Sequence, residues 1–449
     1  MGFFSNYPLY DNDVVLDSKN HQRFVTSVAD EDIISNLAEH LIDPILERLP
    51  IQEAVRTSVL SQKWRYRCTT MSVLNVDFDF AIKLSSKGAF DPNGFIRVIN
   101  KIMIHHKGPI FRFVLYIPYE INLDSFQEVD QWMLILSRNS VKEIILVNSN
   151  QVYPLHSSVF SCMELKYLGI YNCIFKPPIG FEGFPNLQSC NLMNIHFGDH
   201  LGGTVINLPQ LKMLALDTCG NVKSFNIKAV NLRTLRVISC LDSMSLPLLH
   251  SKRLDVVQIR LLKSKVDFPR VERFNLAVML SKLPMVVSFT IDGYFLKFLA
   301  AEKFPKWLPH EAKCLKKLEF QSFNFGDLDQ LEGALYMLQN SPNLKGLHGT
   351  HEQMGPDADL ELTSNHLESP DCLQTLCMLQ TVELTSLEGS RPELLFIKLL
   401  LDHSPRLENM IIRPKATTDT EKRYSIAKDV MLFPRASTKA KMVCLDPQP

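Results

Sequence analysis

The chain has 449 residues, and its 48 lysine and arginine residues balance 48 aspartate and glutamate residues, so the formal net charge is zero. This balance argues against recognition of nucleic acid or of an anionic membrane through a global field. No apolar run approaches the ~18 residues of a membrane span, and the N-terminus lacks the features of a signal peptide. Ten cysteines without dense spacing are typical of reduced, buried thiols. We therefore expect a protein of the cytoplasm or nucleus, with no nucleic-acid or membrane partner.

Residues 1–28 are expected to form a disordered tail, and residues 29–72 are expected to form three short helices. Apolar residues recur with helical spacing at positions 37, 41, 45 and 49. Asn36 is placed to cap this helix, and Pro50 stops it and starts the next one. Ser61 is placed to cap a third helix that carries Trp64. Three short helices cannot bury so much aliphatic surface by themselves, so we expect a partner to cover it.

The same stretch contains several motif elements in a fixed order: Leu37, Ile45-Leu46, Leu49-Pro50, Val55, Val59 and Lys63-Trp64-Arg65. With them it resembles the F-box, the adaptor-binding module of SCF (Skp–cullin–F-box) ubiquitin ligases. The resemblance implies that a Skp-type adaptor binds here and links the chain to a cullin. The docking surface that it implies consists of Leu37, Leu41, Ile45, Leu46, Leu49, Pro50, Ile51, Val55, Val59 and Trp64.

The chain departs from the F-box pattern at two positions. Ala38 stands where the family usually has a proline, which removes a signal for the start of the helix. Pro44 lies inside the first helix, where a basic residue is commoner, and it removes one helical hydrogen bond. These departures bear on how tightly an adaptor would bind.

Residues 73–137 are predicted to contain two strands and two helices. Alternation of apolar and polar residues predicts a strand through Leu74, Val76, Phe78 and Phe80. A helical stripe lies over 95–102, a second strand over 110–117 and a second helix over 130–137. We interpret these elements as degenerate repeat units that cap the open end of a repeat array.

A repeat with the pattern L-x-x-L-x-L-x-x-C organises residues 138–364. Copies begin at positions 141, 165, 187, 211, 232 and 254, so successive starts are 21 to 24 residues apart. This period is typical of leucine-rich repeats, each of which supplies one strand and a return segment. Looser copies follow from positions 286, 315 and 344. We therefore predict an α/β fold, in which a three-helix N-terminal module precedes a solenoid with a curved parallel sheet.

In such a solenoid, the strand residues that alternate with the buried leucines line one concave face. The side chains expected there are aromatic, amide or singly charged, and no one sign of charge dominates. Such a surface suits a protein or small-molecule target better than a polyanion. The candidate residues for binding a protein substrate are Tyr167, Tyr171, Asn191, Met193, Asp217, Arg236, Gln258 and Arg260.

Residues 365–449 are predicted to contain a strand over 379–384, a helix that opens at Pro392, a strand over 406–413 and a last apolar run over 442–445. The helix, Ser404-Pro405-x-Leu407-Glu408 and Phe433-Pro434-Arg435-Ala436-Ser437 resemble the FBD domain of plant F-box proteins. F-box, leucine-rich repeats and FBD then follow one another in the order of that family. The segment is equally compatible with two extra repeats that cap the C-terminal end of the solenoid.

The sequence offers no candidate catalytic, cofactor or metal site. It contains no G-x-x-x-x-G-K-[ST] loop, no G-x-S-x-G elbow and no H-E-x-x-H pair, so we predict that the protein is not an enzyme. Cys173, Cys219 and Cys240 occupy one repeat position and are interpreted as buried structural thiols, because no C-x-x-C spacing is present. His348 and His351 are assigned to a loop and lack partners in a known ligand pattern.

Two functions remain open at this point. The resemblance implies a substrate-recognition subunit of an SCF-type E3 ubiquitin ligase, whose F-box holds the adaptor and whose repeats hold a protein to be ubiquitinated. The alternative is a leucine-rich-repeat interaction scaffold without a ligase role, in which Ala38 and Pro44 mark a decayed F-box. Binding to a Skp-type adaptor separates the two.

Overall fold

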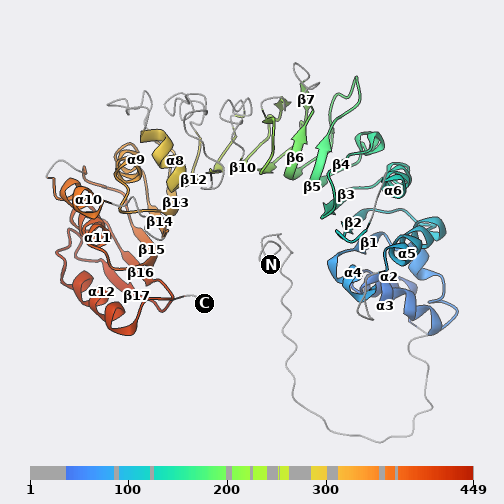
Figure 1. Cartoon of the computed structure of the whole chain (residues 1–449), viewed down its shortest axis with the longest axis horizontal. Coiled ribbons are helices and arrows are strands. Elements are labelled where there is room, and N and C mark those ends of the chain that lie inside the picture. Colours follow the sequence, from blue (N-terminus) through green and yellow to red (C-terminus); the bar gives the residue numbers. More distant parts are fainter. Residues whose placement is uncertain are drawn as a thin grey trace, which may run out of the picture.

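The computed structural model describes residues 37–84, 91–121, 126–198, 205–222, 226–239, 251, 253–261, 285–300, 312–352, 359–369 and 373–447. These residues form an open arc, in which a parallel sheet lines the inner side and helices lie on the outer side (Figure 1). The sheet has 15 strands in the part of the chain described. The predicted α/β solenoid with a curved parallel sheet is confirmed. The predicted tail, residues 1–28, lies outside the described residues.

The N-terminal module begins with α2 (Glu39–Glu47) and α3 (Ile51–Arg56). Pro50 separates them as predicted, and its carbonyl accepts the first hydrogen bonds of α3, from the amides of Glu53 and Ala54. Two 3₁₀ helices follow, η1 (Thr57–Val59) and η2 (Arg67–Thr70). The predicted third α-helix around Trp64 is wrong, because residues 62–66 form turns that direct the indole into the core. The predicted cap, Asn36, lies outside the described residues.

The next segment adds two strands to one end of the sheet, as predicted, with helices outside them. Its elements are β1 (Val73–Val76), α4 (Phe78–Leu84), α5 (Pro92–His105), β2 (Arg112–Ile117) and α6 (Gln127–Ser137). The strand predicted to reach Phe80 is too long. It ends at Val76, because the Asp77 carboxylate accepts a hydrogen bond from the Phe80 amide at 2.9 Å and begins α4 instead.

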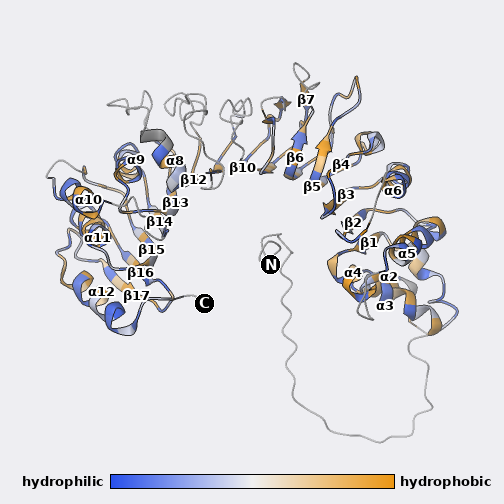
Figure 2. Cartoon of the chain, in the orientation of Figure 1, coloured by the Kyte–Doolittle hydropathy of each residue, from blue (hydrophilic) through white to orange (hydrophobic). Residues whose placement is uncertain are grey.

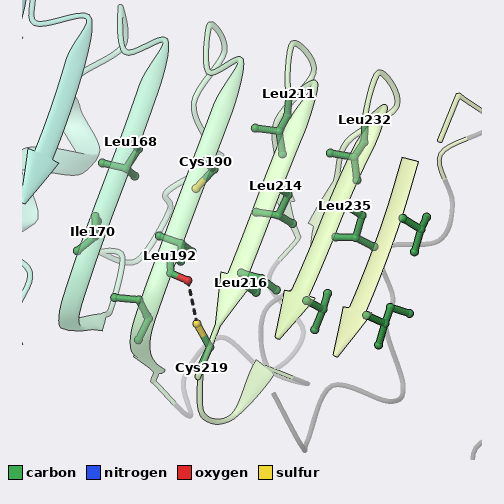
Figure 3. Close-up of a cluster of buried hydrophobic side chains, with 14 of the residues drawn as sticks. Leu168, Ile170, Cys190, Leu192, Leu211, Leu214, Leu216, Cys219, Leu232 and Leu235 are labelled. Carbon is green, nitrogen blue, oxygen red and sulfur yellow. Dashed lines mark hydrogen bonds between the residues drawn. The ribbon is translucent and has the colours of Figure 1, made fainter. Parts of the chain in front are cut away.

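The leucine-rich pattern places a strand at each predicted copy. These strands are β3 (Glu143–Asn148), β5 (Tyr167–Phe175), β6 (Ser189–Phe197), β8 (Met213–Asp217), β10 (Thr234–Ile238) and β11 (Val256–Arg260). Leu168, Cys190, Leu214 and Leu235 lie opposite one another on neighbouring strands, and all are buried (Figure 3). The return segments contain only short elements: β4 (Tyr153–Pro154), η3 (Ser157–Ser161), β7 (Ile206–Asn207) and β9 (Ile227–Lys228).

The later repeats are longer because a helix follows every strand except the last on the outer side. The strands are β12 (Ser288–Asp292), β13 (Lys317–Phe323), β14 (Gly346–His351), β15 (Thr381–Leu387), β16 (Asn409–Pro414) and β17 (Lys441–Cys444). The helices are α8 (Gly293–Ala300), α9 (Leu328–Gln339), α10 (Leu360–Leu367), α11 (Arg391–His403) and α12 (Thr420–Leu432). β14 to β17 pair in sequence, so the C-terminal segment extends the solenoid.

The chain bends at the same position of four successive repeats. Asn172, Asn194, Thr218 and Ser239 have left-handed backbones, with φ of 58°, 52°, 52° and 51°. The next residue turns inward: Cys173 and Cys219 are buried, and Cys219 Sγ lies 3.3 Å from the Leu192 carbonyl oxygen (Figure 3). Both cysteines are free thiols, and burial raises the pKa of Cys173. Cys240 lies outside the described residues.

Two further observations concern metal binding and membrane-spanning helices. In the described ranges, no cluster of three or more histidine, cysteine or acidic residues is arranged to hold a metal ion. Among the described helices, none is long and apolar enough to cross a membrane. The assignment of His348 and His351 to a loop is wrong, since both lie on β14.

Candidate protein-binding surfaces

The N-terminal module leaves large apolar side chains in contact with solvent. α2 is apolar on two sides: Ile42 and Leu46 are buried, whereas Leu41 and Ile45 are exposed. The segment after α3 adds Val59, which is 85% exposed, and Tyr66, which is 67% exposed. Hydrophobic residues are frequent in both the helices and the strands at this end of the arc (Figure 2). We define the N-terminal apolar surface as Leu41, Ile45, Val55, Val59, Leu60 and Tyr66.

The ten predicted adaptor-binding residues divide into three groups. Leu41, Ile45, Pro50, Val55 and Val59 are exposed, and Leu37 and Leu49 are partly buried against the core. Leu46, Ile51 and Trp64 are buried in the core and do not line a surface in this conformation. Leu60 and Tyr66 were missed, because the chain leaves the α-helix after Arg56 and helical spacing no longer indicates which side chains face outward.

The buried side of the module is attached to the first repeat unit. Ile42, Leu46 and Trp64 belong to the same core as Leu74 of β1. Gln52 donates to the Phe80 carbonyl at 3.3 Å, and the Ser72 hydroxyl donates to the Glu47 carboxylate. These contacts hold α2 and α3 in place, so the N-terminal apolar surface is formed in the absence of a partner.

The second surface is the inner face of the sheet. Tyr167, Tyr171, Asn191, Met193, Asp217, Arg236, Gln258 and Arg260 are all partly exposed and alternate with buried residues along their strands. The helices lie on the opposite side of the sheet, so these side chains face the inside of the arc (Figure 1). Strand pairing brings Asn191 opposite Gly169 and Ala215, and Arg236 opposite Ala215 and Gln258. The Tyr167 ring lies over Gly169, where an added Cβ would approach Tyr167 Cε1 to 3.0 Å.

Further along the inner face, charged residues occupy neighbouring strands. Glu319 on β13, His348 on β14 and Glu383 on β15 share one register position. His348 Nδ1 lies 3.7 Å from Glu319 Oε1, and Arg413 Nη2 lies 3.9 Å from Glu383 Oε1. The interaction with His348 outweighs burial and lowers the pKa of Glu319 to about 2, while Glu319 in turn raises the pKa of His348.

A buried pair connects β14 to α11. His351 Nε2 lies 3.4 Å from Glu393 Oε1, and His351 Nδ1 donates to the Phe323 carbonyl at 2.9 Å. Glu393 also accepts a hydrogen bond from the Ser390 amide at 2.8 Å, as expected for the third residue of a capping box. This pair is enclosed by the core, so we assign it a role in holding the C-terminal segment.

Comparisons with known proteins agree with this architecture. A family model described as "At1g61320/AtMIF1, LRR domain" matches residues 102–310. The chain is 30% identical over 417 residues to the F-box/FBD/LRR-repeat protein At1g13570 of Arabidopsis thaliana, a match that covers 92% of this chain and 98% of that protein. It is 22% identical to the F-box/FBD/LRR-repeat protein At5g56420 of the same plant, over 93% of this chain and 99% of that protein.

An internalin from Listeria monocytogenes is similar among solved structures, with a TM-score of 0.30 and 13% identity over 80% of this chain and 95% of that one. A score this low adds nothing to the assignment. None of these matches indicates an enzymatic family. Because At1g13570 is matched from end to end at 30% identity, the chain belongs to the F-box/FBD/LRR-repeat protein family.

Proposed function

We propose that this chain is the substrate-recognition subunit of an SCF-type E3 ubiquitin ligase in the cytoplasm or nucleus. The N-terminal apolar surface binds a Skp-type adaptor, and through it a cullin, while the inner face of the arc binds the protein to be ubiquitinated. The observation that carries the proposal is the exposure of six large apolar side chains on one small module. The F-box names of its relatives support the same assignment.

A surface of this kind favours a protein partner on energetic grounds. Fully burying an aliphatic side chain of this size stabilises a complex by roughly 1.5–3 kcal/mol. Monomeric proteins rarely leave such side chains clustered in water. The contacts of Gln52 and Trp64 with the first repeat unit hold the surface in one conformation, so little ordering cost opposes binding.

The test removes exposed side chains that do not support the core. Combining Leu41→Ala, Ile45→Ala and Val59→Ala is expected to weaken binding of a purified Skp-type adaptor by roughly tenfold to a hundredfold, measured by titration calorimetry. Ile104→Ala is the matched control, because Ile104 is 74% exposed on α5 and lies outside the N-terminal apolar surface. We expect this control to bind the adaptor as the unaltered chain does.

The alternative, a repeat scaffold without a ligase role, has its own support. Pro44 interrupts the hydrogen bonds of α2, and Ala38 at its N-cap offers no side-chain hydrogen bond. If the unaltered chain binds no Skp-type adaptor and Pro44→Arg restores no binding, the scaffold replaces the ligase subunit as the proposed function.

A further inference from the structure

A single file of basic side chains lies along one rim of the arc, at the residue that directly precedes β3, β5, β8 and β10. Lys142, Lys166, Gln188, Lys212 and Arg233 are joined by a ladder of backbone hydrogen bonds, in which each amide donates to the preceding carbonyl at 2.7–2.9 Å. Neighbouring strands lie ~4.8 Å apart, so the four cations span about 19 Å. We define the basic rim as Lys142, Lys166, Lys212 and Arg233.

Nothing on the described surface neutralises the basic rim. The ion pairs within 4.0 Å among the described residues include none of its four members. Glu143, the nearest acidic residue in sequence, pairs instead with Arg112 at 3.3 Å. Lys166, Lys212 and Arg233 are exposed, and Lys142 lies 4.0 Å above the Phe111 ring. Like charges on adjacent strands repel, so this arrangement costs stability.

The fold does not require a cation at this position. The same ladder continues through Asp255, Val287, Lys316, Lys345, Gln380 and Glu408, so the solenoid accepts acidic, apolar and amide side chains there as well as basic ones. The buried residues Val141, Leu165, Leu211 and Leu232 each lie one position earlier, and the side chains of Lys166, Lys212 and Arg233 lie outside the core. A row of four cations without acidic partners in the described part of the chain, at a position where the fold also accepts other residue types, favours a ligand of opposite charge.

We propose that the basic rim binds an extended, carboxylate-rich segment of the protein substrate. That the segment belongs to a substrate rests on the proposed function. The file is one residue wide, and an extended chain rises about 3.3 Å per residue, so roughly six residues cover it. Beside the rim lie Tyr167, Ser189 and Met213, which offer uncharged contacts to intervening side chains. The formal net charge of zero argues against a nucleic acid as the occupant.

The experiment measures peptide binding by fluorescence anisotropy with the full-length chain and no adaptor. The probe is a labelled peptide of alternating glutamate and serine, and its counterpart has glutamine in place of glutamate. We expect the glutamate peptide to bind about tenfold more tightly, with affinity that falls as salt rises. Combining Lys166→Glu, Lys212→Glu and Arg233→Glu should remove that preference. Lys228→Glu, an exposed lysine on β9 outside the rim, should leave it unchanged.

Equal binding of the two peptides, or full binding by the triple variant, would overturn the proposal. Tighter binding of polyuridine RNA, lost in the same variant, would also overturn it and replace the peptide with a nucleic acid. If the triple variant does not fold, as judged by circular dichroism, Lys212→Gln alone provides the comparison. The peptide experiment contains no adaptor, so it is independent of the adaptor titration. A negative peptide result would not contradict adaptor binding, and a negative adaptor titration would not contradict peptide binding.

Discussion

Thr218 has a left-handed backbone conformation, which is unfavourable for a β-branched side chain. Its φ of 52° lies in the left-handed region, which costs roughly 1–2 kcal/mol for an ordinary residue and is unusual for a β-branched one. Asn172 and Asn194 occupy the same repeat position, and asparagine tolerates this conformation. The Thr218 amide donates to the Ile238 carbonyl at 2.8 Å, so strand pairing holds the strained residue in place.

Thr218→Asn is therefore expected to stabilise the protein by roughly 0.5–1 kcal/mol, seen as a higher urea midpoint of unfolding. Asn172→Thr is the converse change and should destabilise, because Asn172 Nδ2 donates to the carbonyls of Asn148 and Asn150 at 3.2 and 2.7 Å. A lower midpoint for Thr218→Asn would show that the strain is not the dominant effect at this position.

The pair His348 and Glu319 makes stability depend on pH. Glu319 raises the pKa of His348 above the ordinary value of 6.5, so the stabilisation is fully present below pH 6.5 and is lost as pH rises through the raised pKa. The pKa of Glu319 is lowered from 4.5 to about 2, so its share is lost only as pH falls through that range. Histidine thus sets the response near neutral pH.

We expect His348→Gln to flatten the loss of thermal stability between about pH 6 and 8, measured by melting at a series of pH values. His196→Gln, which changes an exposed histidine on β6, serves as the control and should retain the slope of the unaltered protein. An unchanged slope in His348→Gln would assign the pH dependence to another group.

At the scale of single elements, local spacing predicted most strands and helices α2, α3, α5, α6 and α11, but not the contacts that choose between alternatives. α2 is apolar on two sides, and only its packing against α3 and η2 decides that Ile42 and Leu46 are buried while Leu41 and Ile45 are exposed. Alternation through Phe80 satisfied the rule for a strand, yet the hydrogen bond that the Phe80 amide donates to the Asp77 carboxylate begins a helix. Helix α12 had no strong apolar period, and it was not predicted.

Substitutions of Pro44 measure how much the stability of α2 depends on its backbone hydrogen bonds. The helix continues through this residue, although proline has no amide hydrogen to donate and costs up to ~3 kcal/mol in a helix interior. Pro44→Arg and Pro44→Ala both restore the donor, so both are expected to slow hydrogen exchange of the α2 amides, measured by mass spectrometry. Unchanged exchange in both variants would mean that packing of Leu46 and Ile42 alone sets the stability of this helix.

For the whole molecule, the repeat period predicted the solenoid because each 21–24-residue unit buries its leucines only against the next. The period could not predict where folding units begin and end. Strand pairing runs without a break from β1 through β14 into β15, across the predicted boundaries at 138 and 365. Those boundaries follow sequence motifs, whereas the hydrophobic core is shared across them.

This continuity predicts that residues 365–449 do not fold alone and that the repeats need them. Phe396 of α11 packs on Phe323 and Phe325, with ring centroids 6.2 and 5.3 Å apart, and Glu393 reaches His351. Removing the segment exposes these rings and the open edge of β14, which favours aggregation. We expect 365–449 alone to show no cooperative thermal transition by circular dichroism, and the chain ending at 364 to melt earlier than the full chain or to aggregate. A cooperative transition in the isolated segment, together with an unchanged melting temperature in the truncated chain, would instead identify an independent domain.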